Sequence, residues 1–199
     1  MVAVQTESGM QAEMAVTPDP GAPACPIDAE SLYRAHAPFV ASFLRHMGTP
    51  ESDLDDHLQD VFVIAHRKGG YQPGPAAPRT WLASLAFRVV VTRRRARARR
   101  PTSVAAVEAL SDDSQRPADV LEARRSLEQV QAALEHLSLE QRAAFILFEI
   151  EGESCERIAA IWDVPVGTIY SRLHHARKRF LEVYGKSAVR QAGNRGGER

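Results

Sequence analysis

The chain has 199 residues, of which 44% are apolar and 7% aromatic, and its 25 basic residues balance 25 acidic ones. This composition is ordinary for a globular protein and excludes a chain that is disordered throughout. Two cysteines cannot build a disulfide framework, and no run of about 20 apolar residues could cross a membrane. Residues 1–26 hold no Lys or Arg and no long apolar run, so we expect no secretory signal. From these observations together we expect no membrane insertion and a cytoplasmic location.

The zero net charge conceals blocks of opposite sign. Residues 61–100 hold ten basic residues and no acidic one (+10), and residues 171–199 hold eight basic and two acidic ones (+6). Residues 1–60, with two basic and ten acidic, and residues 101–170, with five basic and thirteen acidic, each carry −8. One basic block alone is usually a solvated face, but two such blocks indicate two separate cationic surfaces.

The N-terminal segment, residues 1–27, is rich in Pro, Gly and Ala without any period, so we predict a disordered arm. Structure is expected to begin at Asp28, a possible N-cap for a helix. Pro38 either kinks that helix or opens a second one, and Gly48 ends the run.

A second strong helix is predicted after Thr49, the expected N-cap, with Pro50 at its first position. An apolar stripe at helical spacing marks it, and Gly69-Gly70 ends it. The stripe consists of Leu54, Leu58, Val61, Phe62 and Ala65. After a Pro-rich loop, the helical period resumes over residues 79–100, in a helix that is apolar early and cationic late.

Residues 101–117 mix Pro, Ser and Asp and are predicted to be a flexible linker, which could reach roughly 55 Å when extended. A second helical unit is expected over 118–185, followed by a flexible tail over 186–199. Within that unit, Ser138 and Gln141 form a capping box. The fold class is therefore all-α, with two small helical domains joined by a flexible linker.

The second domain contains the pattern of a helix-turn-helix. Ser154 caps a short helix, a turn follows at residues 162–165, and a longer helix then places Ile169, Leu173, Ala176 and Phe180 on its inner side. The outer side is polar and basic, which suits the major groove of DNA because Arg binds guanine edges and phosphates. From the pattern alone, an ordinary helical hairpin with a solvated face is an equally good interpretation.

The segment GESCERIAAIWDVPVGTIYSRLHHARKRF resembles region four of bacterial sigma factors, with PVGT, SRL and AR aligned without gaps. Upstream, SLYRAHAPFVASFLRHMGTPESDLDDHLQDVFVIAHRK resembles the opening of region two. With no further domain between these two, the chain resembles the extracytoplasmic-function (ECF) class. The resemblance implies a transcription factor rather than an enzyme, and it implies core RNA polymerase, promoter DNA and an anti-sigma factor as partners.

The resemblance also assigns roles by position. The family motif D-x-x-Q-E-V-F, on the helix that docks the polymerase clamp, matches Asp56, Gln59, Asp60, Val61 and Phe62, of which all but Val61 are the expected polymerase contacts. The helix over 79–100 matches the segment that reads the minus-ten promoter element, with expected DNA contacts from Arg88, Thr92, Arg93 and Arg95. The loop from Gly69 to Pro78 corresponds to the part that holds an unpaired base; Trp81 could stack on that base, but we favour a core position for it.

The longer helix of the second domain matches the segment that reads the minus-thirty-five element. The DNA contacts implied there are Thr168, Tyr170, Ser171, Arg172, His174, His175, Arg177 and Lys178. Several positions depart from the family pattern: His57 stands where an apolar residue is usual, Asp163 replaces the turn glycine and His175 replaces a common arginine. Arg88 and Thr92 also differ from the common residues, so promoter sequence preference does not transfer.

Two alternatives come from other functional classes. A metal hydrolase is disfavoured because the seven histidines form no HExxH motif, so we expect no metal and no cofactor. Cys155 could be a redox sensor, but a buried inert cysteine is the commoner interpretation. The nearer rival is a free-standing helix-turn-helix regulator that binds DNA without polymerase, which leaves the acidic helix over 51–65 unexplained.

Overall fold

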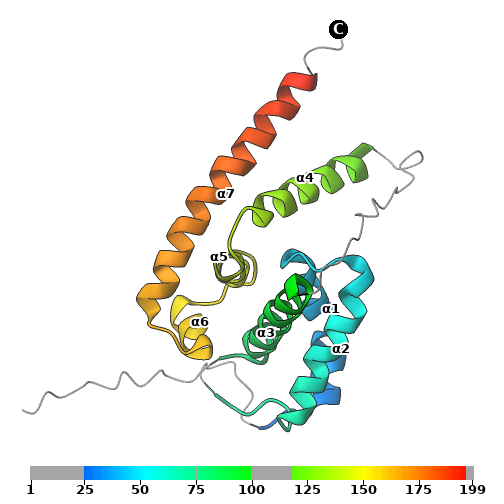
Figure 1. Cartoon of the computed structure of the whole chain (residues 1–199), viewed down its shortest axis with the longest axis vertical. Coiled ribbons are helices and arrows are strands. Elements are labelled where there is room, and N and C mark those ends of the chain that lie inside the picture. The colour runs from blue at the N-terminus through cyan, green and yellow to red at the C-terminus, as the bar shows by residue number, and fades with distance from the viewer. Residues whose placement is uncertain (1–24, 75, 100–117, 196–199) are drawn as a thin grey trace, which may run out of the picture.

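The computed structural model describes residues 25–74, 76–99 and 118–195, and these residues are helical apart from turns and one isolated β-bridge. The elements are α1 (Ala29–His46), α2 (Glu51–Arg67), α3 (Pro78–Arg99), α4 (Ala118–Glu135), α5 (Leu139–Phe145), the π-helical η1 (Ile146–Ile150), α6 (Cys155–Trp162) and α7 (Val166–Arg195). The prediction of an all-α fold is confirmed. Figure 1 shows α1, α2 and α3 gathered beside the group formed by α4, α5, α6 and α7. The predicted linker over 101–117 lies outside the described residues.

The first unit begins one residue earlier than predicted. Ile27, expected in the arm, pairs with Tyr71 through two backbone hydrogen bonds of 3.0 and 2.8 Å, because the returning loop after α2 offers it an antiparallel partner. Asp28 then caps α1 as predicted, accepting from the Ser31 backbone N–H at 2.8 Å. Pro38 lies inside α1, which remains one continuous helix.

The start of α2 differs from the prediction in its chemistry. The N-cap position is Pro50 and carries no side-chain cap, so Thr49 is not the cap. The Thr49 hydroxyl instead lies 3.3 Å from Nδ1 of the buried His57. A histidine at this apolar position is thus given a polar partner, which explains how α2 tolerates the departure from the family pattern.

In the second unit, the Ser138–Gln141 capping box forms at α5 and Ser154 caps α6, both as predicted. The prediction that the unit ends near residue 185 is wrong, because α7 continues to Arg195 through the segment expected as a tail. No breaker residue other than Gly185 interrupts that segment before Gly193, and a single glycine costs a helix only about 1 kcal/mol.

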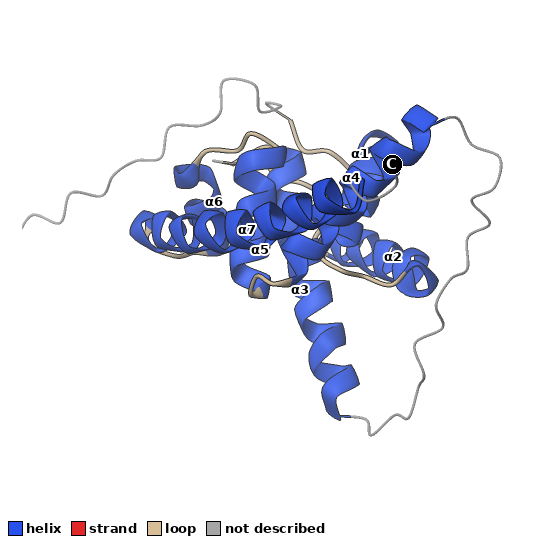
Figure 2. Ribbon diagram, turned by 90° about the horizontal axis from the view of Figure 1, so that it is seen from above, coloured by secondary structure: helices blue, strands red, loops and turns tan. Residues whose placement is uncertain are grey.

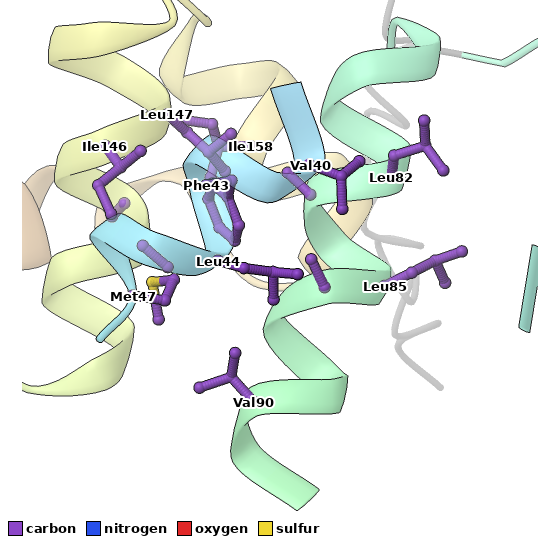
Figure 3. Close-up of a cluster of buried hydrophobic side chains, with 14 of the residues drawn as sticks. Val40, Phe43, Leu44, Met47, Leu82, Leu85, Val90, Ile146, Leu147 and Ile158 are labelled. Carbon is purple, nitrogen blue, oxygen red and sulfur yellow. The ribbon is translucent and has the colours of Figure 1, made fainter. Parts of the chain in front are cut away.

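Both units contribute to one hydrophobic cluster. Phe43 and Met47 of α1 lie with Leu82 and Leu85 of α3, and residues of η1 and α6 reach the same cluster (Figure 3). The two predicted domains are therefore packed against each other. Figure 2 shows that the C-terminal turns of α3 leave this packed body and stand clear of the other helices.

Candidate nucleic-acid and protein interfaces

The helix-turn-helix forms as the sequence predicts. Asp163 adopts the left-handed conformation (φ 53°) at the end of α6, and Val164 closes the turn by donating to the Ala159 carbonyl at 3.1 Å. Asp adopts this left-handed conformation more readily than most other residues that carry a side chain. Asp163 can therefore stand where the family pattern has the turn glycine. On α7, Ile169, Leu173 and Ala176 are buried, which fixes the opposite face outward.

The outward face of α7 carries most of the predicted DNA contacts. The exposed residues are Tyr170, Ser171, His174, His175, Arg177 and Lys178, while Thr168 and Arg172 are half-buried. Tyr170 donates its hydroxyl hydrogen bond to Glu156 at 2.9 Å, and this bond to a carboxylate raises the pKa of the Tyr170 phenol.

The two arginines of this face are already oriented by neighbours. Arg177 donates to the Glu149 carboxylate at 2.5 Å, and its guanidinium lies 5.1 Å above the Phe148 ring. The Arg172 guanidinium lies 5.8 Å from the centre of the Trp162 ring. The sequence did not reveal Glu149 and Trp162 as neighbours of these arginines, because nothing in their local pattern marks them as facing α7.

The arginines of α3 divide between two faces. Arg88, Thr92 and Arg95 are exposed at positions i, i+4 and i+7, and they form one stripe that Arg99 extends. Arg93 faces the other way and donates from Nε to Asp60 of α2 at 2.9 Å, while Arg97 lies 3.7 Å from Asp53. The structure thus brings together three of the four predicted DNA contacts of α3 and separates Arg93 from them. Arg99 was missed, although its helical spacing from Arg88 was available.

A groove on the surface of α1 and α2 contains part of the predicted polymerase-binding set. It has a volume of about 740 Å³, and Gln59 and Phe62 line it beside the exposed side chains of Tyr33 and Val63. Phe62 itself is only 7% exposed, because its ring packs edge-on against Tyr33 with centroids 4.9 Å apart. Asp56 and Asp60 lie outside this groove, on the side of α2 that faces the α3 arginines. Tyr33 and Val63 were missed by sequence analysis, although exposed apolar side chains that flank a groove are typical of a protein-binding surface.

The loop between α2 and α3 is anchored by aromatic residues. Tyr71 is buried and donates its hydroxyl to the Ala76 carbonyl at 2.8 Å, and Trp81 packs edge-on against it at 5.9 Å. Trp81 is half-buried in this contact, which agrees with the interpretation of it as a core residue. Gly70 has φ +82°, and a Cβ there would lie 2.2 Å from the Ile27 carbonyl oxygen, so the loop needs glycine at this position.

The described residues contain no group of three or more His, Cys, Asp or Glu side chains that could hold a metal ion. None of the described helices is both long and apolar enough to span a membrane. Cys155 is buried, and burial raises the pKa of its thiol, which disfavours the reactive thiolate.

Comparison with known proteins matches both halves of the chain. Residues 32–100 match the family model "Sigma-70 region 2", and residues 127–180 match "Sigma-70, region 4". The chain is 31% identical to the ECF RNA polymerase sigma factor SigE of Mycolicibacterium smegmatis, over 82% of this chain and 64% of that protein. It is 32% identical to the ECF RNA polymerase sigma factor SigM of Mycobacterium tuberculosis, over 78% of this chain and 76% of that protein. The chain thus spans just under two thirds of SigE and about three quarters of SigM.

A solved structure shares the fold. The sigma factor RpoE of Bartonella quintana, in complex with the anti-sigma factor NepR, superposes with a TM-score of 0.60 and covers 77% of this chain and 94% of that chain. The sequence identity is 24%, so the likeness concerns the arrangement of helices. The shared arrangement includes helices of both helical units described above.

Proposed function

The chain belongs to the extracytoplasmic-function class of RNA polymerase sigma factors, and from this we propose that it binds core RNA polymerase and directs it to specific promoters. The observation that carries the proposal is the presence, in one chain, of a groove flanked by exposed apolar side chains on α1 and α2 and of two helices, α3 and α7, that each expose a basic face. A free-standing regulator needs the helix-turn-helix but has no use for the groove. The sigma factor therefore accounts for more of the surface than the regulator does.

We assign polymerase binding to the α2 surface, with Gln59 and Phe62 at the groove and Asp56 and Asp60 on the adjoining acidic side. Apolar side chains supply most of the binding free energy in such interfaces, and charged residues at the rim set the rate and specificity of association. The half-exposed Tyr33 and Val63 are the apolar side chains that this groove offers.

Promoter contacts are assigned to the exposed stripe of α3 and the outer face of α7. Arg88, Thr92 and Arg95 on α3 would contact the minus-ten element, where a flipped base costs a few kcal/mol that cationic walls offset. On α7, Arg172 and Arg177 are the side chains able to make bidentate contacts with guanine or bind phosphate. An anti-sigma factor that covers the polymerase-binding surface is part of the same proposal.

The groove assignment is tested by titrating core polymerase with fluorescently labelled chain. Val63→Glu places a charge in the groove and is expected to weaken core binding about tenfold or more. Ala35→Glu is the matched control, because Ala35 is exposed on α1 and does not line the groove. Equal affinity of the parent, the control and Val63→Glu would refute the assignment.

A further inference from the structure

Tyr170 lies near the start of the longer helix of the helix-turn-helix and is held by a residue of the helix before it. It belongs to the second turn of α7, and its side chain is 52% exposed. Its hydroxyl donates to the carboxylate of Glu156, in the first turn of α6, at 2.9 Å. In helix-turn-helix domains the N-terminal residues of the second helix contact the edges of bases. Tyr170 therefore stands where a base edge would be read.

The direction of this hydrogen bond is set by its two partners. Hydrogen bonds from its own backbone N–H, from Tyr170 and from the Ser154 side chain lower the pKa of the Glu156 carboxyl, so the group is ionised near neutral pH. An ionised carboxylate only accepts hydrogen bonds, so the phenol supplies its single proton to Glu156. The Tyr170 oxygen keeps two lone pairs and has no further proton, so it can only accept from an outside partner.

The same contact fixes the position of that oxygen. A tyrosine side chain has two χ angles, and this one is held at its backbone end by α7 and at its hydroxyl end by α6. A side chain that is already held in its bound position loses little conformational freedom when a ligand binds. The acceptor is therefore presented in place before DNA arrives.

The charge of Glu156 disfavours a contact with the DNA backbone. In the described part of the chain, the groups that hydrogen-bond to its carboxylate are neutral, so a negative charge remains beside the Tyr170 hydroxyl. Phosphate oxygens are negatively charged and accept hydrogen bonds, as the Tyr170 oxygen does. Two acceptors cannot bond to each other, which leaves a base edge as the partner of Tyr170.

The major groove offers hydrogen-bond donors on only two of the four bases. These donors are the amino groups at N4 of cytosine and N6 of adenine, whereas guanine and thymine present the carbonyl oxygens O6 and O4. A side chain that only accepts can bond to the amino groups and is repelled by the carbonyl oxygens. The Tyr170 oxygen therefore matches cytosine and adenine.

Arg177 provides the contrast on the same helix. Glu149 accepts from its Nε, and its Nη groups can only donate, so Arg177 suits guanine or phosphate. Tyr170 and Arg177 are about 10 Å apart along the axis of α7, whereas neighbouring base pairs are about 3.4 Å apart. We therefore expect them to contact different base pairs.

We propose that the Tyr170–Glu156 pair determines specificity within the minus-thirty-five contact, and that it selects cytosine or adenine over guanine or thymine on the strand it faces. Tyr170 makes the contact, and Glu156 is a positioning residue that takes up the phenol proton. This inference rests on the proposed function, because it requires the outer face of α7 to read promoter DNA.

The test measures binding of DNA duplexes by the full chain together with core polymerase. The parental chain first selects a binding sequence from a random pool. In the upstream element of that sequence, each cytosine or adenine is then replaced in turn by the base that lacks its amino group, pyrimidin-2-one or purine. At one position this change should weaken parental binding about fivefold, because the hydrogen bond to the amino group is lost.

Tyr170→Phe keeps the ring and removes the acceptor. At that position the variant should bind the natural duplex and the analogue duplex equally, while it keeps the parental preferences elsewhere. A contact that only joined α6 to α7 would instead lower the affinity for every duplex alike. Circular dichroism checks that each variant keeps the parental helix content.

Glu156→Gln tests the positioning role. The neutral amide can donate as well as accept, so the phenol proton is free to bond to O6 of guanine or O4 of thymine. With either base at the position, binding by Glu156→Gln should be stronger than binding by the parent. Glu182→Gln makes the same chemical change in a residue of α7 that pairs with Arg179, beyond the predicted contacts, and it should behave like the parent.

Two outcomes would overturn the inference, and they can be told apart. If the parental chain with core polymerase selects no sequence, the proposed function fails and the inference fails with it. If a sequence is selected but the parent and Tyr170→Phe lose the same affinity on every analogue duplex, only the acceptor role of Tyr170 is refuted.

Discussion

Arg93 of α3 donates to Asp60 of α2 at 2.9 Å, so a residue predicted to bind DNA is bonded to one predicted to bind polymerase. The bond and the neighbouring carboxylates raise the pKa of Arg93 further, and the pair lies at the surface. If polymerase engages Asp60 as proposed, it competes with Arg93 for the same carboxylate. The two surfaces of the first unit meet at this pair.

Asp60→Arg is expected to weaken core binding while the domain stays folded. An exposed substitution usually changes the free energy of unfolding by only about ±0.5 kcal/mol, and a surface ion pair contributes little more. Arg93→Ala is the control, because it breaks the same pair and leaves the Asp60 carboxylate in place. If Arg93→Ala binds core polymerase as weakly as Asp60→Arg does, core binding depends on the Arg93–Asp60 ion pair and not on the Asp60 carboxylate itself. The assignment of Asp60 as a polymerase contact would then be wrong.

Arg172→Ala and Arg177→Ala should each weaken promoter binding by the holoenzyme. Loss of a base contact costs about 1–3 kcal/mol and relaxes specificity, whereas loss of a phosphate contact reduces the salt slope by about one. Arg179→Ala is the matched control on α7, since Arg179 is paired with Glu182 and lies beyond the predicted contacts. Parental binding by both variants over a range of salt concentrations would show that this face of α7 does not read DNA.

Stability is expected to fall as the pH drops below about 6.5. Burial, with a smaller contribution from Arg93, lowers the pKa of His57, and burial also lowers the pKa values of His36 and His46. A base whose pKa is lower in the folded state takes up its proton preferentially on unfolding, so folding loses free energy as the pH falls from 6.5 through the folded pKa.

Urea denaturation of His57→Leu at pH 7.5 and 5.5 isolates one part of this dependence. Between the two pH values, the unfolding free energy of the variant should fall by less than that of the parent. The fall that remains in the variant is due to His36 and His46. An identical loss in both proteins would mean that His57 does not titrate differently on folding.

The two glycines that end α2 should differ in their tolerance of a side chain. Both have positive φ, so Gly69→Ala should cost about 1–2 kcal/mol from backbone strain alone. Gly70→Ala adds a clash with the Ile27 carbonyl, and it should cost more and break the Ile27–Tyr71 bridge. Thermal unfolding of the two variants gives the comparison; equal destabilisation would indicate that Ile27 moves away freely.

Much of this fold was predictable because its signals are local. The caps at Asp28, Ser138 and Ser154, and the inward stripe of α7, depend only on residues within a few positions of one another. The end of α7 was predicted wrongly because residues 186–195 contain no clear signal that ends a helix. The predicted cap at Thr49 was wrong because the Thr49 hydroxyl lies against His57, eight positions away, and does not cap α2.

For the candidate site, the sequence predicted the residue types and the helix face on which they lie, but not their partners on other helices. Helical spacing places Arg88, Thr92 and Arg95 on one stripe, but the partner of Arg93 lies on another helix. The contact of Arg142 with Met47 joins residues 95 positions apart, and no local pattern encodes it. Interface contacts of this kind depend on how whole helices pack, which periodicity alone does not determine.

Reconstituted transcription tests whether the chain acts as a sigma subunit. Purified chain is added to core RNA polymerase that lacks any sigma subunit, on a pool of genomic promoter fragments, and the RNA 5′ ends are mapped. We expect transcripts that start at a discrete set of positions, that are absent with core alone and that are reduced by Arg172→Ala. No transcript above core alone, together with initiation only when another sigma subunit is supplied, would contradict this expectation.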